Sequence, residues 1–188
     1  MLDNVILKGG SILIAEPFSV DKYFERSVVL LIDYHERYGG MGFILNKRIK
    51  DKLNDFFPEM KDIDDIPVFG GGPLGSNKLY FIHTLGDIVS GAYKILDGLY
   101  FGGDFGIIKS YITSGNPVEG KIKFFLGYSG WERRQLEEEI AQRSWLVGKG
   151  EQAKIMKSEG EILWKKALHD LGSQYKSWAN FPRRPFLN

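Results

Sequence analysis

Short apolar runs separated by glycine, proline and polar residues dominate the first two thirds of this chain. Runs of this length, rich in β-branched and aromatic side chains, are typical of strands. They predict strands over residues 11–15, 27–34, 42–46, 67–70, 79–84, 91–96, 99–101, 121–128 and 145–148.

Helical periodicity appears mainly later in the chain. Asp104 is placed to cap a helix that runs to about Ser114 and stops at Gly115. Short helical turns are predicted at 21–25 and before Pro58, within an irregular polar segment, 51–65. Further helices are predicted over 131–142 and over 162–171, the last with Ser158 and Glu161 as a capping box and Gly172 as its stop.

Many strands followed by segregated helices favour an α+β fold rather than a doubly wound one. The length of 188 residues favours one domain over residues 1–188. We expect its core to span about 10–171 and residues 172–188 to form an extended tail.

Composition narrows the function classes. The net charge of +1 is too small to attract nucleic acid by non-specific electrostatics. The absence of cysteine excludes disulfides and thiolate chemistry. Met1–Lys8 lacks the apolar core of a signal peptide, and no apolar run approaches the length of a bilayer span. We therefore expect a soluble, cytoplasmic protein that does not enter a membrane. Residues 51–65 carry a local charge of −4 and residues 149–188 one of +4, which predicts solvated segments or, less commonly, contact patches.

Two glycine-rich motifs resemble known cofactor-binding or catalytic motifs. Residues 70–75 match G-x-G-x-x-G, but a strand follows where a dinucleotide site needs a helix, so a tight connection is favoured. Its glycines could still bring bare amides close to a ligand. Residues 127–131 resemble a nucleophile elbow, yet Trp131 replaces the last glycine, and Ser129 with Glu132 fits a helix capping box instead.

The three histidines, His35, His83 and His169, have no spacing typical of a metal site. His83 ends an apolar strand, and we interpret it as a histidine whose ring nitrogens are hydrogen-bonded by neighbouring groups. We predict no catalytic residue, no metal ligand and no cofactor.

Several segments together resemble one family: Gly10–Ala15 with Pro17, Phe24-x-Arg26-Ser-Val-Val29, Gly42-x-x-x-Asn46, Gly71-Gly-Pro73, and Leu126-Gly-Tyr-x-Gly-Trp131 with Gln135-Leu136. This ordered set, which spans residues 10 to about 171, resembles the YqgE/AlgH family of bacterial proteins. The resemblance implies an α+β domain whose mixed, mostly antiparallel split sheet forms a pseudo-barrel with helices packed outside. Its members are often labelled transcriptional regulators.

The matched positions define a candidate ligand site. We expect its members to converge on one concave surface, where a guanidinium, amides and bare N–H groups could hold an anion. Trp131 and Gln135 are expected on one helix face, with Trp131 as a core anchor or a ligand platform. Equally, Arg26 could pair with an acid and Asn46 could cap a turn. The candidate residues are Arg26, Asn46, Gly71, Gly72, Gly127, Tyr128, Gly130, Trp131 and Gln135.

The sequence favours a non-enzymatic regulatory or ligand-sensing protein with a small ligand or a protein partner. The alternative is an enzyme acting on a small phosphate- or carboxylate-bearing substrate, using Arg26, Asn46 and Gln135. That alternative lacks a nucleophile, a metal set and a clear general base. Direct, specific DNA binding is not expected, because neither a helix-turn-helix pattern nor a basic face is present.

Overall fold

The computed structural model describes residues 6–19, 21–157 and 159–182. Its strands are β1 (Ser11–Ala15), β2 (Val28–His35), β3 (Gly39–Ile44), β4 (Arg48–Lys52), β5 (Pro67–Gly70), β6 (Leu74–His83), β7 (Tyr93–Leu96), β8 (Leu99–Phe101), β9 (Ile122–Trp131) and β10 (Trp145–Lys149). Its helices are α1 (Leu53–Phe56), α2 (Phe105–Thr113), α3 (Gln135–Ala141), α4 (Gln152–Lys157) and α5 (Gly160–Leu171), with 3-10 turns η1 (Pro58–Met60), η2 (Ser173–Tyr175) and η3 (Trp178–Asn180).

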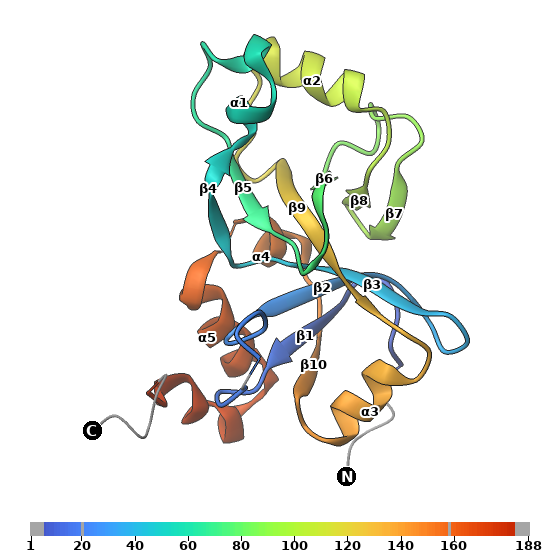
Figure 1. Cartoon of the computed structure of the whole chain (residues 1–188), viewed down its shortest axis with the longest axis vertical. Helices are drawn as coiled ribbons and strands as arrows, with labels where there is room; N and C mark the ends of the chain where they lie inside the picture. The colour runs from blue at the N-terminus through green and yellow to red at the C-terminus, as the bar shows by residue number, and fades with distance from the viewer. Residues whose placement is uncertain (1–5, 20, 158, 183–188) are drawn as a thin grey trace.

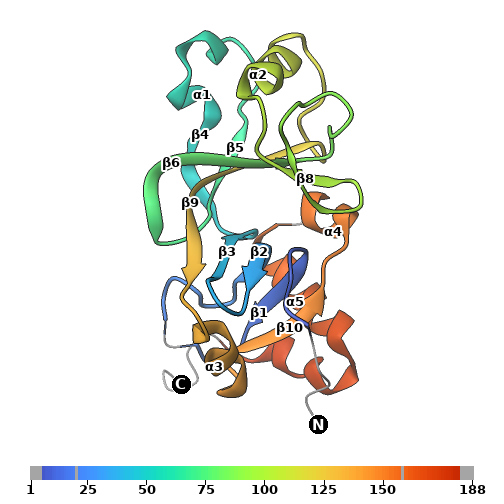
Figure 2. The same ribbon diagram turned by 90° about the vertical axis from the view of Figure 1, so that its right-hand side faces the viewer.

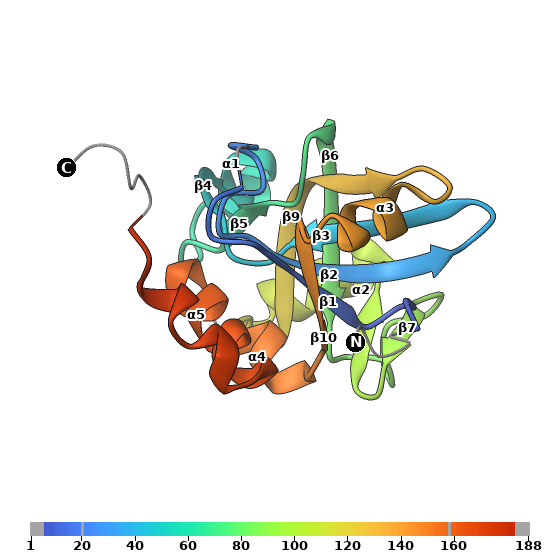
Figure 3. The same ribbon diagram turned by 90° about the horizontal axis from the view of Figure 1, so that it is seen from below.

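The strands form one curled sheet in the order β10-β1-β2-β3-β9-β6-β8-β7, with β4 and β5 attached beside β9. Along that path every neighbouring pair is antiparallel, whereas β5 runs parallel to β9. Seen from below, β6 and the first part of β9 cross the direction of β2 and β3, so the sheet closes into a half-barrel (Figure 3). The predicted α+β fold with a mostly antiparallel sheet and outer helices is confirmed.

Strand β9 joins the two halves of the sheet. It pairs with β5 as far as Leu126 and with β6 as far as Tyr128, and its last residues, from Ser129, pair with β3. Gly127 lies between the residues paired with β5 and those paired with β3, with φ of 72°, a backbone conformation that favours glycine. The glycine-rich motif therefore turns one strand from one half of the sheet into the other.

Three apolar clusters fill the molecule from end to end. One includes side chains of α1 and α2, the helices at the top of Figure 1; one lies between the sheet and α4 and α5; and one lies between the sheet and α3, the helix at the bottom. Ile12 and Ile14 of β1 enter the central cluster, while Leu13 and Ala15 enter the α3 cluster. Because β1 and the first five residues of β2 are buried on both faces, residues 12–15 and 28–32 are continuous apolar runs instead of alternating ones. The views in Figures 1 and 2 show α3 at the end opposite α1 and α2.

Helix α5 is anchored to the sheet by a buried tryptophan. Trp164 is fully buried, and its indole Nε1–H donates to the carbonyl of Ala15 at 2.8 Å. Leu163 and Leu168 pack beside it in the central cluster. This anchoring holds α5 against the sheet near two predicted site residues, Arg26, which precedes β2, and Asn46, which follows β3.

Four local predictions differ from the structure. Strand β9 continues through Trp131, which pairs with Gly40, so α3 starts only at Gln135. Strand β4, which was not predicted, includes the first two residues of the predicted irregular segment 51–65, and α4 was not predicted. Residues 173–175 and 178–180 form 3-10 turns where an extended tail was expected. Ser158, of the predicted capping box, lies outside the described residues.

Candidate functional site

Arg26 is buried and bound by the chain's own groups. Its guanidinium forms an ion pair with Glu161 of α5, donates to the carbonyl of Phe181, and lies 4.9 Å from the centroid of the Trp164 ring. Its backbone has φ of 51°, the left-handed conformation, which costs a non-glycine residue about 1–2 kcal/mol. The structure thus gives Arg26 the acidic partner that was one of its two predicted roles.

Asn46 connects the strands to α5 in the same region. Its Oδ1 accepts from the Val28 amide at 2.9 Å, and its Nδ2 donates to the carbonyls of Arg26 at 2.9 Å and Gly160 at 3.1 Å. Only 7% of the residue is exposed. Asn46 and Arg26 therefore form one cluster, which we call the Arg26 cluster.

The predicted glycines form a second cluster where β9 passes the end of β5. A Cβ on Gly71 would lie 2.3 Å from the carbonyl oxygen of Gly127, and one on Gly72 would lie 2.3 Å from the backbone of Tyr128. Tyr128 packs edge to face on Tyr80 at 5.8 Å between centroids. These glycines allow two backbones to touch, a role that the predicted tight connection anticipates.

Trp131 and Gln135 do not share a helix face, because Trp131 ends β9 and Gln135 begins α3. Trp131 is 5% exposed and packs in the α3 cluster, as expected of a core anchor. Gln135 is exposed; its Oε1 accepts from the Glu132 amide and its Nε2 donates to Glu139, both at 2.9 Å. The side chain of Gln135 thus turns toward its own helix.

The nine predicted residues are therefore distributed over several local settings. The segment from Ile44 to Lys47, which contains Asn46, runs beside Gly70 and Gly71. The Ile44 amide donates to the Gly71 carbonyl at 2.9 Å, and the Gly70 amide donates to the Lys47 carbonyl at 2.8 Å. The Arg26 cluster and the glycines are therefore neighbours. None of the nine lines either of the two cavities described below. Ligand binding by these residues stays a prediction.

Two residues that were considered as catalytic candidates, Ser129 and His83, form hydrogen bonds within the protein. Ser129 lies within β9, where its hydroxyl donates to the carbonyl of Gly71 at 3.1 Å, so the predicted helix cap is wrong. His83 is fully buried; its Nε2 contacts the Gly102 carbonyl at 3.0 Å and its Nδ1 accepts from the Leu85 amide at 3.1 Å. These two contacts confirm the expectation that neighbouring groups satisfy both ring nitrogens, and burial lowers the pKa of His83.

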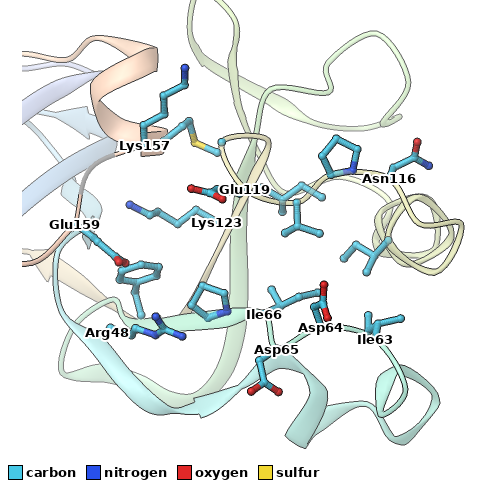
Figure 4. A pocket seen from close by; sticks show the side chains of 18 of the residues that line it. Arg48, Ile63, Asp64, Asp65, Ile66, Asn116, Glu119, Lys123, Lys157 and Glu159 are labelled. Carbon is cyan, nitrogen blue, oxygen red and sulfur yellow. The ribbon is translucent and has the colours of Figure 1, made fainter.

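A cavity of about 850 Å³, which the sequence did not predict, opens between segments far apart in the chain. The loop before β5, the loop that follows α2, and the connection from α4 to α5 supply its walls, as Figure 4 shows. Small-molecule sites commonly have volumes of about 300–1,000 Å³. We call it the Lys123 cavity, after the one residue of its wall that is both charged and deeply buried.

Lys123 belongs to β9 but is only 6% exposed. Its ammonium donates to the carbonyls of Ile155 at 3.1 Å and Leu45 at 3.3 Å, and it lies 4.5 Å from the centroid of the Phe69 ring. Burial lowers the pKa of Lys123 to about 8, while the nearby charge of Glu159 opposes this shift. The amine is therefore mostly charged at neutral pH, although burial disfavours its charged form.

The other charges of the cavity are arranged unevenly. Arg48 and Lys157 lie on the same side as Lys123, and Figure 4 shows Glu119 and Glu159 on either side of the Lys123 side chain. Three aspartates of the loop before β5 also line the cavity, Asp62, Asp64 and Asp65, and Figure 4 shows Asp64 and Asp65 away from Lys123. Within the described ranges, no three carboxylates or histidines gather as a possible metal site.

One sequence signal could have indicated Lys123. It is the single charged residue in the run Ile122-Lys-Phe-Phe-Leu126, where strand burial leaves little room for a cation. The acidic segment 51–65, interpreted as a solvated or contact patch, supplies the three aspartates of the cavity.

Comparison with known proteins defines the family. The AlgH-like family model matches residues 12–176. The chain belongs to the AlgH-like family. The resemblance drawn from the sequence is thereby confirmed.

Relatives match over nearly their whole length. A UPF0301 protein of Parabacteroides distasonis is 51% identical over 187 residues, covering 99% of this chain and 94% of the relative. A UPF0301 protein of Chlorobium limicola is 35% identical over 182 residues, covering 97% and 96%.

Two solved structures share the fold of this AlgH-like chain. A crystal structure from Corynebacterium diphtheriae has a TM-score of 0.77 at 20% identity, covering 94% of this chain and 93% of the other. The solution structure of the AlgH protein from Pseudomonas aeruginosa has a TM-score of 0.72 at 24% identity, covering 97% and 98%. At these identities the likeness concerns the fold alone. In the part of the chain that the structure describes, no helix has the length and apolar character to cross a bilayer.

Proposed function

We propose that this protein is a cytoplasmic, regulatory ligand sensor without catalytic activity, and that it binds a small carboxylate- or phosphate-bearing molecule in the Lys123 cavity. The observation that carries the proposal is a lysine, only 6% of which is exposed, in the wall of a cavity of about 850 Å³. A charge is costly to bury unless a partner compensates it. A ligand anion beside Lys123 would supply additional compensation.

The pKa of Lys123 supports an anionic ligand. At a pKa of about 8 the charged form is disfavoured by burial, and a nearby anion restores it. Arg48 and Lys157 provide further positive charge on the same side of the cavity. Binding at neutral to mildly basic pH should therefore be accompanied by proton uptake and weaken as the pH rises above about 8.

The origin of the walls supports sensing. The cavity is bounded by segments of β4–β5, of α2–β9 and of α4–α5, which are distant in sequence. A ligand that contacts all three would link them and reduce their independent movement. Sensors commonly work in this way, by shifting the population of arrangements that differ in ligand affinity.

An enzyme remains the second candidate, and the same lysine is the observation that favours it. An amine with a lowered pKa can condense with a carbonyl compound, releasing water and forming an imine. Borohydride added in the presence of pyruvate would then leave a stable adduct on Lys123, detected by peptide mass spectrometry. No such adduct is expected from a sensor.

A comparison of two lysine variants tests the proposed function. Inorganic phosphate, succinate and glucose 6-phosphate are titrated by calorimetry into the wild-type protein, Lys123→Met and Lys50→Met. Lys50 is exposed and lies outside the cavity, so its variant controls for loss of charge. At least one probe should bind the wild type and Lys50→Met below about 1 mM and bind Lys123→Met at least about 10-fold more weakly. Equal binding to all three proteins, or no binding of any probe, contradicts the proposal.

A further inference from the structure

A second cavity, of about 420 Å³, lies on another face of α4. The sheet strands β1, β2 and β10 form one side, and α4 and α5 form the other. Its floor consists of buried aliphatic side chains from the central cluster: Ile12, Ile14, Val28, Leu45, Ile155 and Leu163. We call it the acyl groove.

Helix α5 adds an apolar stripe to one side of the acyl groove. Leu163, Ala167 and Leu171 recur at intervals of four, so they project from one face of the helix. Gly148 of β10 lies opposite: a Cβ there would approach Leu171 Cδ2 at 3.4 Å and Ile14 Cδ1 at 3.6 Å. The groove is open partly because β10 carries no side chain at this position.

The rim of the acyl groove is charged. Lys154 is neutralised by Glu151 at 3.0 Å and Asp170 at 2.9 Å. Lys149 and Lys166 also line the groove and are exposed, and neither forms an ion pair with another described residue. An apolar floor is thus bordered by two ammonium groups that are available to an anion.

We propose that the acyl groove binds a free, straight-chain fatty carboxylate, with its chain on the aliphatic floor and its carboxylate at Lys149 and Lys166. At about 30 Å³ for each water-sized group, the volume of 420 Å³ holds about 14 such groups, which suits a chain of medium length. Burial of each methylene is favourable, so the chain supplies affinity and the lysines select the head group. The proposal rests on this groove and not on the Lys123 cavity.

The probe for the acyl groove is decanoate, used below its micelle-forming concentration and titrated by calorimetry. We expect decanoate to bind the wild type below about 1 mM, acetate to give no binding, and decyltrimethylammonium to bind at least about 10-fold more weakly than decanoate. Equal affinity for the two decyl compounds, or no decanoate binding, overturns the proposal. Binding to phosphatidylglycerol vesicles without binding of decanoate also overturns it, because the ligand source would then be a membrane.

Variants locate the site. Lys149→Gln with Lys166→Gln should weaken decanoate binding by about 10-fold or more, while Lys78→Gln, on an exposed position of β6, should leave it unchanged. Gly148→Val should fill the groove and abolish binding, since its backbone does not require glycine and the added Cβ meets ordinary contacts. If Gly148→Val fails to fold, the double variant at Lys149 and Lys166 still tests the proposal. Wild-type affinity in the double variant contradicts the assignment.

Discussion

Trp131 and Trp145 meet edge to face at 6.1 Å between ring centroids and donate their indole N–H groups to the same oxygen, Oε2 of Glu139. The N–H···O distances are 2.9 and 2.8 Å. One carboxylate on α3 thus satisfies the donors at the ends of β9 and β10. This contact replaces the ion pair between Glu139 and Arg143 that their spacing favours: among the described residues, no such pair forms.

Removal of that acceptor should destabilise the α3 end of the molecule. Glu139→Ala is expected to lower the free energy of unfolding by about 2–4 kcal/mol, because two largely buried donors lose their partner. Glu139→Gln keeps a carbonyl oxygen and should cost less. Chemical denaturation measures both, with Glu138→Ala, an exposed neighbour, as the control. A loss no larger than that of the control would show that the indoles do not depend on Glu139.

The second prediction separates the structural role of Arg26 from a ligand-binding one. Arg26→Ala should lower the free energy of unfolding by about 1–3 kcal/mol, because the carbonyl of Phe181 loses a charged donor and Glu161 loses one of its cationic partners while keeping Lys165 at 3.5 Å. Arg26→Gly should cost about 1 kcal/mol less than Arg26→Ala, since φ of 51° is strained for alanine but not for glycine. Thermal and denaturant unfolding check both values, with the exposed Arg133→Ala as control. An unchanged stability would favour the ligand-site interpretation.

The third prediction concerns stability at basic pH. Since the pKa of Lys123 is lowered to about 8 from 10.5, the unfolded chain binds more protons than the folded one between these values. Stability should therefore rise from about pH 8 toward pH 10, and the full difference is about 3 kcal/mol at about 1.4 kcal/mol per pH unit. In Lys123→Met this rise should disappear, and Lys50→Met should retain it. An identical pH profile in all three proteins contradicts the assignment.

The fourth prediction concerns acid. Because burial lowers the pKa of His83, the unfolded chain takes up a proton below about pH 6.5 before the folded chain does. Stability contributed by neutral His83 should be present above that pH and decrease as the pH falls toward the folded-state pKa. His83→Gln should flatten this part of the profile, whereas His35→Gln, at an exposed position, should not. Urea unfolding between pH 7 and 5 measures the difference.

The sequence predicted the fold best where glycine and proline bound an apolar run. The predicted strands at 11–15, 67–70 and 99–101 agree with β1, β5 and β8 residue for residue. Strand β4 was missed because Arg48–Lys52 is mostly polar and lies at the border of the sheet. Its conformation is determined by pairing with β5 and not by an apolar pattern in its own sequence. The helix start at Trp131 was wrong because pairing with β3 extends β9 past the glycine turn.

The site was less predictable than the fold. Family positions such as Arg26 and Asn46 stand out in the sequence as polar residues beside apolar strands, but their partners, Glu161 and Gly160, are more than a hundred residues away. The Lys123 cavity depends on three loops and connections meeting in space, which no local pattern encodes. Only the unusual position of Lys123 within an apolar strand marks it in advance.

Helix α4 forms part of both cavities, with Ile155 in the floor of the acyl groove and Met156 and Lys157 in the wall of the Lys123 cavity. The carbonyl of Ile155 also accepts a hydrogen bond from Lys123. A fatty carboxylate that displaces this short helix therefore changes the affinity for an anion at Lys123, and thermodynamic linkage requires the anion to change the affinity for the fatty carboxylate by the same factor. We therefore expect the six residues of α4 to couple the two proposed binding events.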